Sequence, residues 1–417
     1  MFSIKDTALK TNLAYREFLK KGSTKLKNEI LKTIGSMIYE NRQFIIDENS
    51  KDLENAEKAG VSKAFLDRLA LDDKRLEGMR KACEEITALP DPVGKVYDMV
   101  VRPQGFRVGK MRVPIGVIGI IYEARPNVTI EAAALCLKSG NGVILRGGTN
   151  AYNSNMALAK ILKQALNKHK VSEALVSYIE SRDREAVDEM VVQDDFIHLI
   201  IPRGGEGLIR SVVEKSKIPV LKHYKGVCHI YVHSKADLEM ALKIILNAKV
   251  QRPAVCNSME TLLVDKEIAS SFLPMVLKEL QKQGVEIRGC KKTISLYSED
   301  VKLASDEDYY AEFLDLILAV RVVDNVDEAI EHINHYGSGH TDAIITDDIK
   351  TANGFINNVD SASVMVNAST RLSDGGVYGL GAEIGISTDR LHARGPMGLE
   401  ELTTYKWIVL GEGHIRN

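Results

Sequence analysis

Short apolar runs alternate with helical patterns over two long stretches of the chain, and this alternation limits the folds it can adopt. In the first stretch, the apolar run at 114–121 is followed by an Ala- and Leu-rich helical pattern at 129–138 and a second apolar run at 143–145. Strands that are apolar along their whole length, with helices between them, are typical of a parallel sheet covered on both faces. The sequence therefore predicts an α/β fold.

The same alternation continues on both sides of a polar segment near 256. The first stretch goes on with predicted helices from about 152, at 183–192 and at 206–216, and with predicted strands at 175–180, 196–201 and 219–221. The second stretch has predicted strands at 261–264, 316–323, 343–345 and 363–366, and predicted helices at 267–283, 326–336 and 349–358. We predict two parallel-sheet α/β domains.

The flanking segments have other patterns. Residues 1 to about 90 show apolar side chains at helical spacing, and a Pro-Asp-Pro sequence at 90–92 ends that run. Residues 97–113 alternate around a Gln-Gly turn, which predicts a hairpin. The segment 403–410 reads as a last strand, expected to pair with that hairpin in this or another subunit.

Composition narrows the class of protein. A chain of 417 residues with 45% hydrophobic and 27% charged residues is typical of a globular protein with more than one domain. A formal charge of −2 provides no general attraction for nucleic acid. We predict no membrane association and a cytosolic location, because there is no signal-peptide pattern and no apolar run of about 20 residues.

The five cysteines indicate a reducing compartment and show no metal-binding spacing. Cys256 differs from the others because it lies in a polar loop, four residues after Arg252 and directly before Asn257. A cysteine reacts as the thiolate, so nearby positive charge and donors favour a nucleophile. The alternative is a buried thiol that packs as a small apolar residue. The helix predicted to end near Val250 places Cys256 beyond a helix C-terminus, where the dipole disfavours a thiolate.

Further polar clusters follow predicted strands. Asn127 could cap the helix that starts there or donate to an oxyanion, and Arg125 could hold an anion. Glycine-bearing turns at 146–150 and 202–207 could hold phosphates at helix N-termini or be ordinary strand-to-helix turns, and neither matches GxGxxG. An irregular, glycine-rich segment containing Arg371, His392 and Arg394 is expected to be functional.

The order of these segments resembles that of the gamma-glutamyl phosphate reductases, which belong to the aldehyde dehydrogenase superfamily. The resemblance extends over nearly the whole chain. It is carried by PIGVIGIIYEARPNVT (114–129), ILRGG (144–148), IPRGG (201–205), KHYKG (222–226), QRPAVCNSME (251–260) and LHARGPMGL (391–399).

The resemblance implies a cofactor-binding domain at 1–226 with a hairpin at about 99–113, a catalytic domain at 227–400, and a strand of an oligomerisation flap at 401–417. It implies NADPH-dependent reduction of L-glutamyl 5-phosphate to L-glutamate 5-semialdehyde with release of phosphate, the second step of proline biosynthesis. It also implies a homo-oligomer, and it leaves open a functional coupling to glutamate 5-kinase.

The resemblance also assigns roles to residues. Cys256 matches the nucleophile that forms a thioester, and Asn127 matches the oxyanion-hole amide. Cofactor contacts are expected from Arg146, Gly147, Gly204, Gly205 and Gly207, and substrate contacts from Arg125, Arg252, Arg371 and Arg394, with no metal ion.

His223 stands where aldehyde-oxidising relatives carry a Glu that activates water, which fits a thioester kept for hydride. Three alternatives are an aldehyde-oxidising NAD(P)-dependent dehydrogenase of the same superfamily, a cysteine hydrolase and a non-catalytic binding protein.

Overall fold

The structure is a computed structural model that describes residues 3–416. The chain divides into two compact units. The first contains residues up to 222 together with 379–385 and the segment from 397 onward, and the second contains 223–378 and 386–396. Within the described residues, no helix is both long and apolar enough to cross a bilayer.

The first unit is built on a four-stranded parallel sheet in the order β5-β4-β3-β6. Its strands are β3 (Val117–Tyr122), β4 (Gly142–Arg146), β5 (Val176–Tyr178) and β6 (Leu199–Arg203). Every residue of β3 and β4 is buried, which explains why these strands are apolar without alternation.

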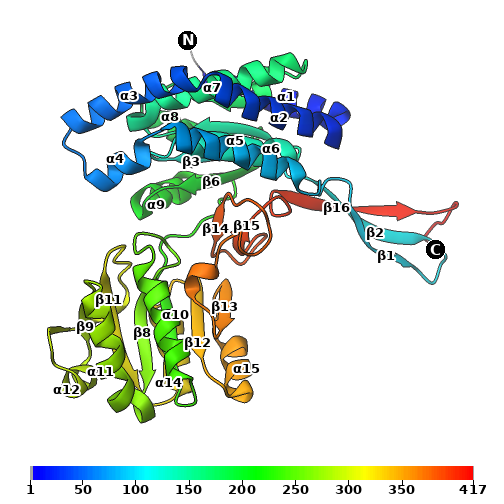
Figure 1. The fold of residues 1–417 in the computed structure, drawn as a ribbon. Coiled ribbons are helices and arrows are strands. Elements are labelled where there is room, and N and C mark those ends of the chain that lie inside the picture. The colour runs from blue at the N-terminus through cyan, green and yellow to red at the C-terminus, as the bar shows by residue number, and fades with distance from the viewer. Residues whose placement is uncertain (1–2, 417) are drawn as a thin grey trace. The chain divides into compact units, whose positions relative to one another are not determined.

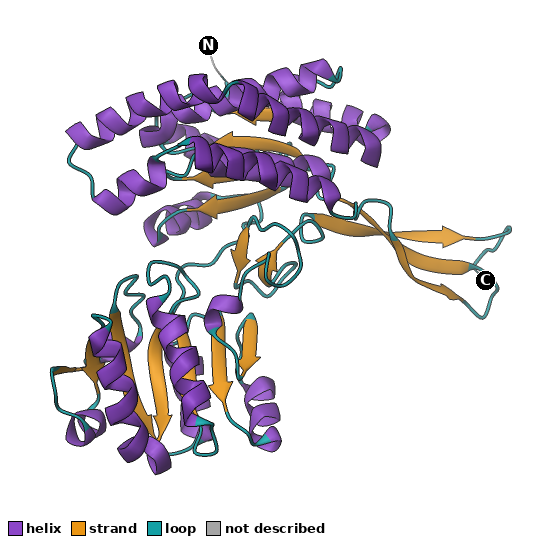
Figure 2. Cartoon of the chain, viewed as in Figure 1, coloured by secondary structure: helices purple, strands orange, loops and turns teal. Residues whose placement is uncertain are grey.

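Helices cover both faces of this sheet (Figure 1, Figure 2). They are α1 (Ile4–Lys21), α2 (Thr24–Glu40), α3 (Arg42–Lys58), α4 (Lys63–Leu69), α5 (Asp73–Ala88), α6 (Asn127–Lys138), α7 (Tyr152–Lys168), α8 (Glu185–Met190) and α9 (Glu206–Lys215), with short 3₁₀ turns at Thr149–Ala151 and Glu173–Leu175. Apolar side chains of α1, α8 and α9 pack with Ile121, Ile144 and Ile200 in one buried cluster.

A three-stranded antiparallel ribbon, hereafter the flap, projects from the first unit (Figure 1). It consists of β1 (Val96–Val101), β2 (Arg107–Pro114) and β16 (Thr403–Leu410), in the order β1-β2-β16. β16 pairs with β2 along its whole length, from Thr403 opposite Pro114 to Leu410 opposite Arg107. The expected pairing of the last strand with the hairpin is therefore confirmed within one chain.

The second unit is built on a seven-stranded sheet in the order β10-β9-β11-β8-β7-β12-β13, and every pairing in it is parallel. Its strands are β7 (Cys228–Val232), β8 (Met259–Asp265), β9 (Glu286–Gly289), β10 (Val301–Leu303), β11 (Ile317–Val323), β12 (Thr341–Ile345) and β13 (Ser363–Val366). Its helices are α10 (Leu238–Val250), α11 (Lys266–Lys282), α12 (Lys291–Leu296), α13 (Asp306–Tyr309), α14 (Val326–Tyr336) and α15 (Ile349–Asn358), with a 3₁₀ turn at Thr370–Leu372.

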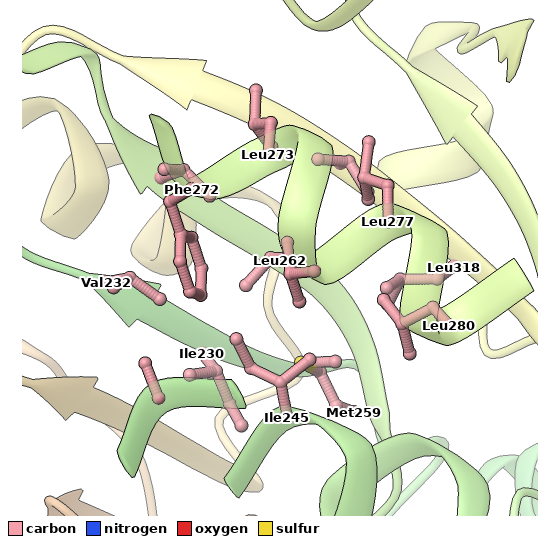
Figure 3. Close-up of a cluster of buried hydrophobic side chains, with 14 of the residues drawn as sticks. Ile230, Val232, Ile245, Met259, Leu262, Phe272, Leu273, Leu277, Leu280 and Leu318 are labelled. Carbon is pink, nitrogen blue, oxygen red and sulfur yellow. The ribbon is translucent and has the colours of Figure 1, made fainter. Parts of the chain in front are cut away.

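Alternate side chains of the central strands point to opposite layers of helices. Ile230 and Leu262 pack with α10 and α11 in the cluster of Figure 3. Their neighbours Tyr231 and Leu263 pack on the other face, with apolar residues of α14 and α15. The α/β fold predicted from the sequence, with two parallel sheets and a small antiparallel one, is therefore confirmed.

Some predicted elements differ from the structure. The segment at 219–221 forms only a single bridge to β6, because Pro219 has no N–H to donate and the contact is limited to its carbonyl and the Leu221 N–H. β7 and β9 were not predicted. The irregular segment near 371–396 contains two short strands that pair with each other, β14 (Gly385–Ser387) and β15 (Gly395–Met397).

One buried histidine of the second unit has no polar partner. His332 of α14 packs against the rings of Tyr309 and Tyr336, at centroid distances of 5.0 and 4.5 Å, and neither of its ring nitrogens makes a hydrogen bond. Burial lowers the pKa of His332 to about 2, with smaller contributions from His229 and Arg321. The folded chain therefore keeps this ring neutral at pH values where the unfolded chain protonates it.

We expect His332→Phe to weaken the acid sensitivity of folding. Because the unfolded state binds one more proton than the folded state between about pH 6.5 and pH 2, stability is lost as the pH falls through this window. Removing the ring nitrogens should reduce the slope of the free energy of unfolding against pH by up to about 1.4 kcal/mol per pH unit. Urea unfolding between pH 7 and pH 4 measures this slope. His335→Phe, at an exposed position of α14, is the matched control, and equal slopes for wild type and His332→Phe would contradict the prediction.

Candidate active site

Cys256 is half-buried in the loop between α10 and β8. The five cysteines are all thiols. Burial raises the pKa of Cys83, Cys136 and Cys228. Burial also acts to raise the pKa of Cys290, but hydrogen bonds from Thr293 and from backbone N–H groups outweigh it, so this pKa is lowered. Accessibility therefore leaves Cys256 and Cys290 as the two cysteines able to react.

The backbone at Cys256 is held by very close packing. A Cβ atom placed on Gly226 would lie 1.8 Å from the carbonyl oxygen of Cys256, so only glycine fits there. The same carbonyl accepts a hydrogen bond from the Cys228 thiol at 3.2 Å. The Gly226 N–H donates to Glu312 at 2.9 Å, which fixes this backbone from its other side. These contacts set the position of the Cys256 peptide without using its side chain.

A buried ion pair joins the two elements on either side of the Cys256 loop. Lys249 at the end of α10 lies 2.6 Å from Glu260 at the start of β8, and both side chains are fully buried. The Leu314 N–H also donates to Glu260 at 3.2 Å. Burial raises the pKa of Glu260 to about 7, despite the opposing effect of Lys249. The pair fixes the two ends of the loop relative to each other.

Arg371 lies beside this loop. It donates to Gln251 at 2.9 Å and to Asn257, whose own amide donates to the Ser373 carbonyl at 2.8 Å. Burial lowers the pKa of Arg371, Arg252 lowers it further, and Cys256 opposes both effects. The structure thus brings together three of the predicted site residues: Cys256, Arg252 and Arg371.

Arg394 lies in a different polar environment of the same unit. It donates to the Asp360 side chain at 2.8 Å and to the Asp360 carbonyl at 3.1 Å, and Arg390 pairs with the same carboxylate. These residues line a cavity of about 390 Å³. The positive charge of Arg394 is therefore already paired with an acidic side chain.

Two histidines lie at Cys256. One ligand atom each from His223, Cys256 and His340 lie within 4.8 Å of one another, and the two rings meet edge to face at 5.5 Å. His340 is fully buried, and burial lowers its pKa to about 3, with a smaller contribution from His223. Sequence reasoning singled out His223 but missed His340. The Gly-Ser-Gly-His sequence at 337–340, directly before an apolar strand, was the available signal.

The first unit contains a cavity of about 850 Å³ at the carboxyl ends of its strands, where ligands bind in open α/β sheets. It is lined by Phe65, Ile121, Tyr122, Glu123, Ala124, Arg146, Gly148, Thr149, Asn150, Arg182, Arg184, Val187, Asp188, Gly207, Leu208, Ser211 and Lys215. Arg182, Arg184 and Lys215 were not expected from the sequence, because isolated surface cations carry no motif. The size and the basic lining suit a large anionic ligand.

The glycine turn after β4 has a mostly structural role. Arg146 is buried, and its guanidinium donates to the backbone carbonyls of Gly147, Arg182 and Asp183 at 2.8–3.2 Å. A Cβ on Gly147 would lie 2.1 Å from the Asn155 side chain, so glycine is needed there for packing. Of the two glycines in this turn, Gly148 lines the cavity, together with Arg146, Thr149 and Asn150.

The second glycine turn precedes α9. A side chain of the protein occupies the place at the N-terminus of α9 where an anion could bind. The Gly205 N–H donates to the Glu123 carboxylate at 3.2 Å. A Cβ on Gly204 would lie 2.7 Å from the same carboxylate carbon, whereas Gly205 and Gly207 face open space. Of these three glycines, Gly207 lines the cavity.

Asn127 and Arg125 follow β3. The capping role considered for Asn127 is wrong, because Pro126 occupies the N-cap and makes no side-chain bond. The Asn127 amide instead donates to Glu131 at 3.1 Å. Burial raises the pKa of Glu131, and the hydrogen bond from Asn127 opposes this. Arg125 is exposed in the same turn.

Comparison with known proteins supports one family. The chain matches the aldehyde dehydrogenase family over residues 14–290 and 311–408. It is 59% identical over 399 residues to the gamma-glutamyl phosphate reductase of Thermodesulfovibrio yellowstonii, covering 96% of this chain and 95% of the relative.

Solved structures agree with this match. The crystal structure of gamma-glutamyl phosphate reductase from Thermotoga maritima has a TM-score of 0.98 and 49% identity, with full coverage of both chains. Glyceraldehyde-3-phosphate dehydrogenase from Methanocaldococcus jannaschii, complexed with NADP, has a TM-score of 0.65 at 19% identity, covering 99% of this chain and 95% of that one, and shows the shared fold. The chain therefore belongs to the aldehyde dehydrogenase family and, within it, to the gamma-glutamyl phosphate reductases.

Proposed function

We propose that the chain reduces L-glutamyl 5-phosphate to L-glutamate 5-semialdehyde with NADPH and releases phosphate, as the second step of proline biosynthesis. The observation that carries the proposal is the position of Arg371, which donates to Asn257 directly beside Cys256, in a family whose similar relatives are named for this reaction. An acyl phosphate carries negative charge next to the carbon under attack, and a cation beside the nucleophile suits that charge.

We assign NADPH to the cavity of the first unit. The cavity is large, lies at the carboxyl ends of the parallel strands and carries Arg182, Arg184 and Lys215 on its lining. Lys215 already pairs with Asp188 at 2.6 Å, which leaves the two arginines as the stronger candidates for the cofactor phosphates. NADPH supplies the hydride when bound. NADP in the Methanocaldococcus jannaschii relative is consistent with this assignment.

The protein's own residues would form and protect the acyl intermediate. The Cys256 thiolate attacks the acyl carbonyl, the C–O bond to phosphate breaks, and a thioester remains on Sγ. The Cys256 N–H and the Asn127 amide are proposed to stabilise the oxyanion. Arg371 would bind an anionic group of the substrate, and Arg252 is a second candidate. Arg125 and Arg394 are weaker candidates, because Arg125 is exposed and Arg394 is paired with Asp360.

We expect Cys256→Ala to abolish oxidation of glutamate semialdehyde in the reverse reaction, which requires NADP⁺ and phosphate. Binding of NADPH, followed by its fluorescence, should remain, because the proposed cofactor cavity lies in the first unit. Cys290→Ser is the matched control, since it removes the other accessible thiol of the second unit and should keep most activity. Equal loss in both variants, or faster oxidation of simple aldehydes in phosphate-free buffer, would contradict the proposal.

We expect Gly226→Ala to lower kcat on the order of 100-fold, because the new Cβ would displace the Cys256 peptide. Alkylation of Cys256 by iodoacetamide, followed by mass spectrometry, should change in rate as well. Gly354→Ala in α15 is the control, because a Cβ there meets no atom within 4 Å. Wild-type kcat in the Gly226→Ala enzyme would show that the close packing does not position the nucleophile.

We also propose that the flap mediates assembly with a second copy of the chain. Trp407 and Val409 are 60% and 62% exposed on one face of β16, and β1 and β16 both present an unpaired edge. These features are more typical of an interface than of a free surface.

Replacing both Trp407 and Val409 by Asp should shift the protein toward monomer in sedimentation velocity. Ile349→Asp is the control, because Ile349 is 78% exposed and belongs to α15 of the second unit, which is not part of the flap sheet. An unchanged sedimentation coefficient in the double variant would argue against assembly through the flap.

A further inference from the structure

Three side chains that are distant in the sequence form a cluster of potential metal ligands in the second unit. His223 precedes β7, Cys256 precedes β8 and His340 directly precedes β12, and one ligand atom from each lies within 4.8 Å of the other two. The sequence predicted no metal site, because no short motif connects these positions. The cluster arises only once the strands are placed side by side.

The hydrogen bonds of His340 determine which of its nitrogens can accept a metal. Its Nδ1 lies 2.9 Å from Thr341 Oγ1, and the Thr341 hydroxyl donates its own proton to Ser373 at 3.0 Å. Nδ1 therefore carries the ring proton and donates it to Thr341. The nearby Cys228 thiol donates elsewhere, to the Cys256 carbonyl. The Nε2 lone pair of this fully buried ring is left without a hydrogen-bond partner.

His223 is also held through its Nδ1. Its Nδ1 lies 2.9 Å from the Ile386 carbonyl, and because a carbonyl only accepts, the neutral ring carries its proton on Nδ1. In this tautomer the ring's lone pair is on Nε2. Histidines that bind metals through one nitrogen usually donate the other N–H to a backbone carbonyl or another oxygen, which fixes the ring. Both histidines at Cys256 fit that pattern.

We propose that Cys256 Sγ and the Nε2 atoms of His223 and His340 bind a divalent cation of the zinc type, and that the bound ion blocks the nucleophile. One thiolate and two neutral imidazoles are ligands that Zn²⁺ prefers, and the fourth position would hold water. On binding, the S–H bond breaks, its proton goes to solvent and an S–Zn bond forms, with no change of oxidation state.

The geometry requires a small contraction. Tetrahedral zinc with its usual bond lengths separates its ligand atoms by roughly 3.3–3.6 Å. One ligand atom of each residue lies within 4.8 Å of the other two, so a pair of ligand atoms at that limit would close by roughly 1.2–1.5 Å. His223 and Cys256 lie in loops and are half-buried, so rotation of their side chains can supply this movement.

The positive charge near the cluster favours a metal ion that binds reversibly. Arg371 lies close enough for Cys256 to affect its pKa, and its positive charge opposes a second cation. Metal binding would then be reversible and inhibitory, and it would compete with substrate for the same thiol. The inhibition rests on the proposed role of Cys256, whereas the binding itself does not.

Titration with Co²⁺ and Zn²⁺ tests the binding directly. With Co²⁺, the unmutated chain should show a thiolate charge-transfer band and intense d–d bands at one equivalent. Zn²⁺ in competition with a chromophoric chelator should bind at one equivalent and protect Cys256 from iodoacetamide. Cys256→Ser should lose the charge-transfer band, whereas Cys290→Ser should keep it. Equal Zn²⁺ affinity in wild type and Cys256→Ser would overturn the proposal.

His340→Asn should weaken Zn²⁺ binding by at least about tenfold. His332→Phe, which changes another buried histidine of this unit outside the cluster, should bind as wild type. If His340→Asn does not fold by circular dichroism, X-ray absorption of the zinc complex of the unmutated chain decides the question. One sulfur and two imidazole ligands support the site, and a shell of oxygen ligands excludes it.

Activity measurements separate the two proposals. Zn²⁺ inhibition of semialdehyde oxidation that a chelator reverses supports the inhibitory role. An unmetallated chain that is inactive but binds Zn²⁺ through Cys256 contradicts the proposed function and leaves the metal site intact. An active chain whose activity is unchanged with Zn²⁺ bound at Cys256 excludes the inhibitory role.

Discussion

Parallel pairing of buried strands is the constraint from which the rest of this architecture follows. A parallel strand must be followed by a crossover, and here most crossovers are helices that cover one face or the other of a sheet. All strands of such a sheet point the same way, so the loops before them gather at one edge and the loops after them at the opposite edge. The two units use opposite edges. The cavity of the first unit lies at the carboxyl ends of its strands, whereas the Cys256 cluster lies at the amino ends of β7, β8 and β12.

The amino ends of β7, β8 and β12 can hold a site because their loops are packed against one another through the backbone. Gly226 lies against the Cys256 carbonyl, and Cys228 donates to the same oxygen. The position of the proposed nucleophile is therefore set by contacts to its main chain. A reaction that depends on an accurately placed thiol benefits when the backbone, and not the reactive side chain, fixes the position of that thiol.

The sequence was sufficient to predict the fold class, because β3 is apolar along its whole length, as a parallel sheet covered on both faces requires, and Leu262, Leu263 and Val264 make the centre of β8 apolar as well. It was less informative about β7, whose five residues begin with Cys and His and resemble a loop when read alone. Cys256 could be singled out from its polar neighbours, and Arg371 from its irregular glycine-rich segment. The convergence of His340 on Cys256 could not be derived, since it depends on the strand order β8-β7-β12, which local patterns do not encode.

The buried pair of Lys249 and Glu260 has a consequence for how this protein can change over evolutionary time. Losing one partner leaves the other charge in the interior, which typically costs about 3–5 kcal/mol, a large part of the stability of most domains. Exchanging both for apolar residues of similar volume can be neutral. The two positions are therefore expected to change together. Sequences in which only one of the two residues is replaced are strongly disfavoured, so both residues tend to be kept or both replaced. Since the pair holds both ends of the Cys256 loop, a change in either residue also affects the position of the proposed nucleophile.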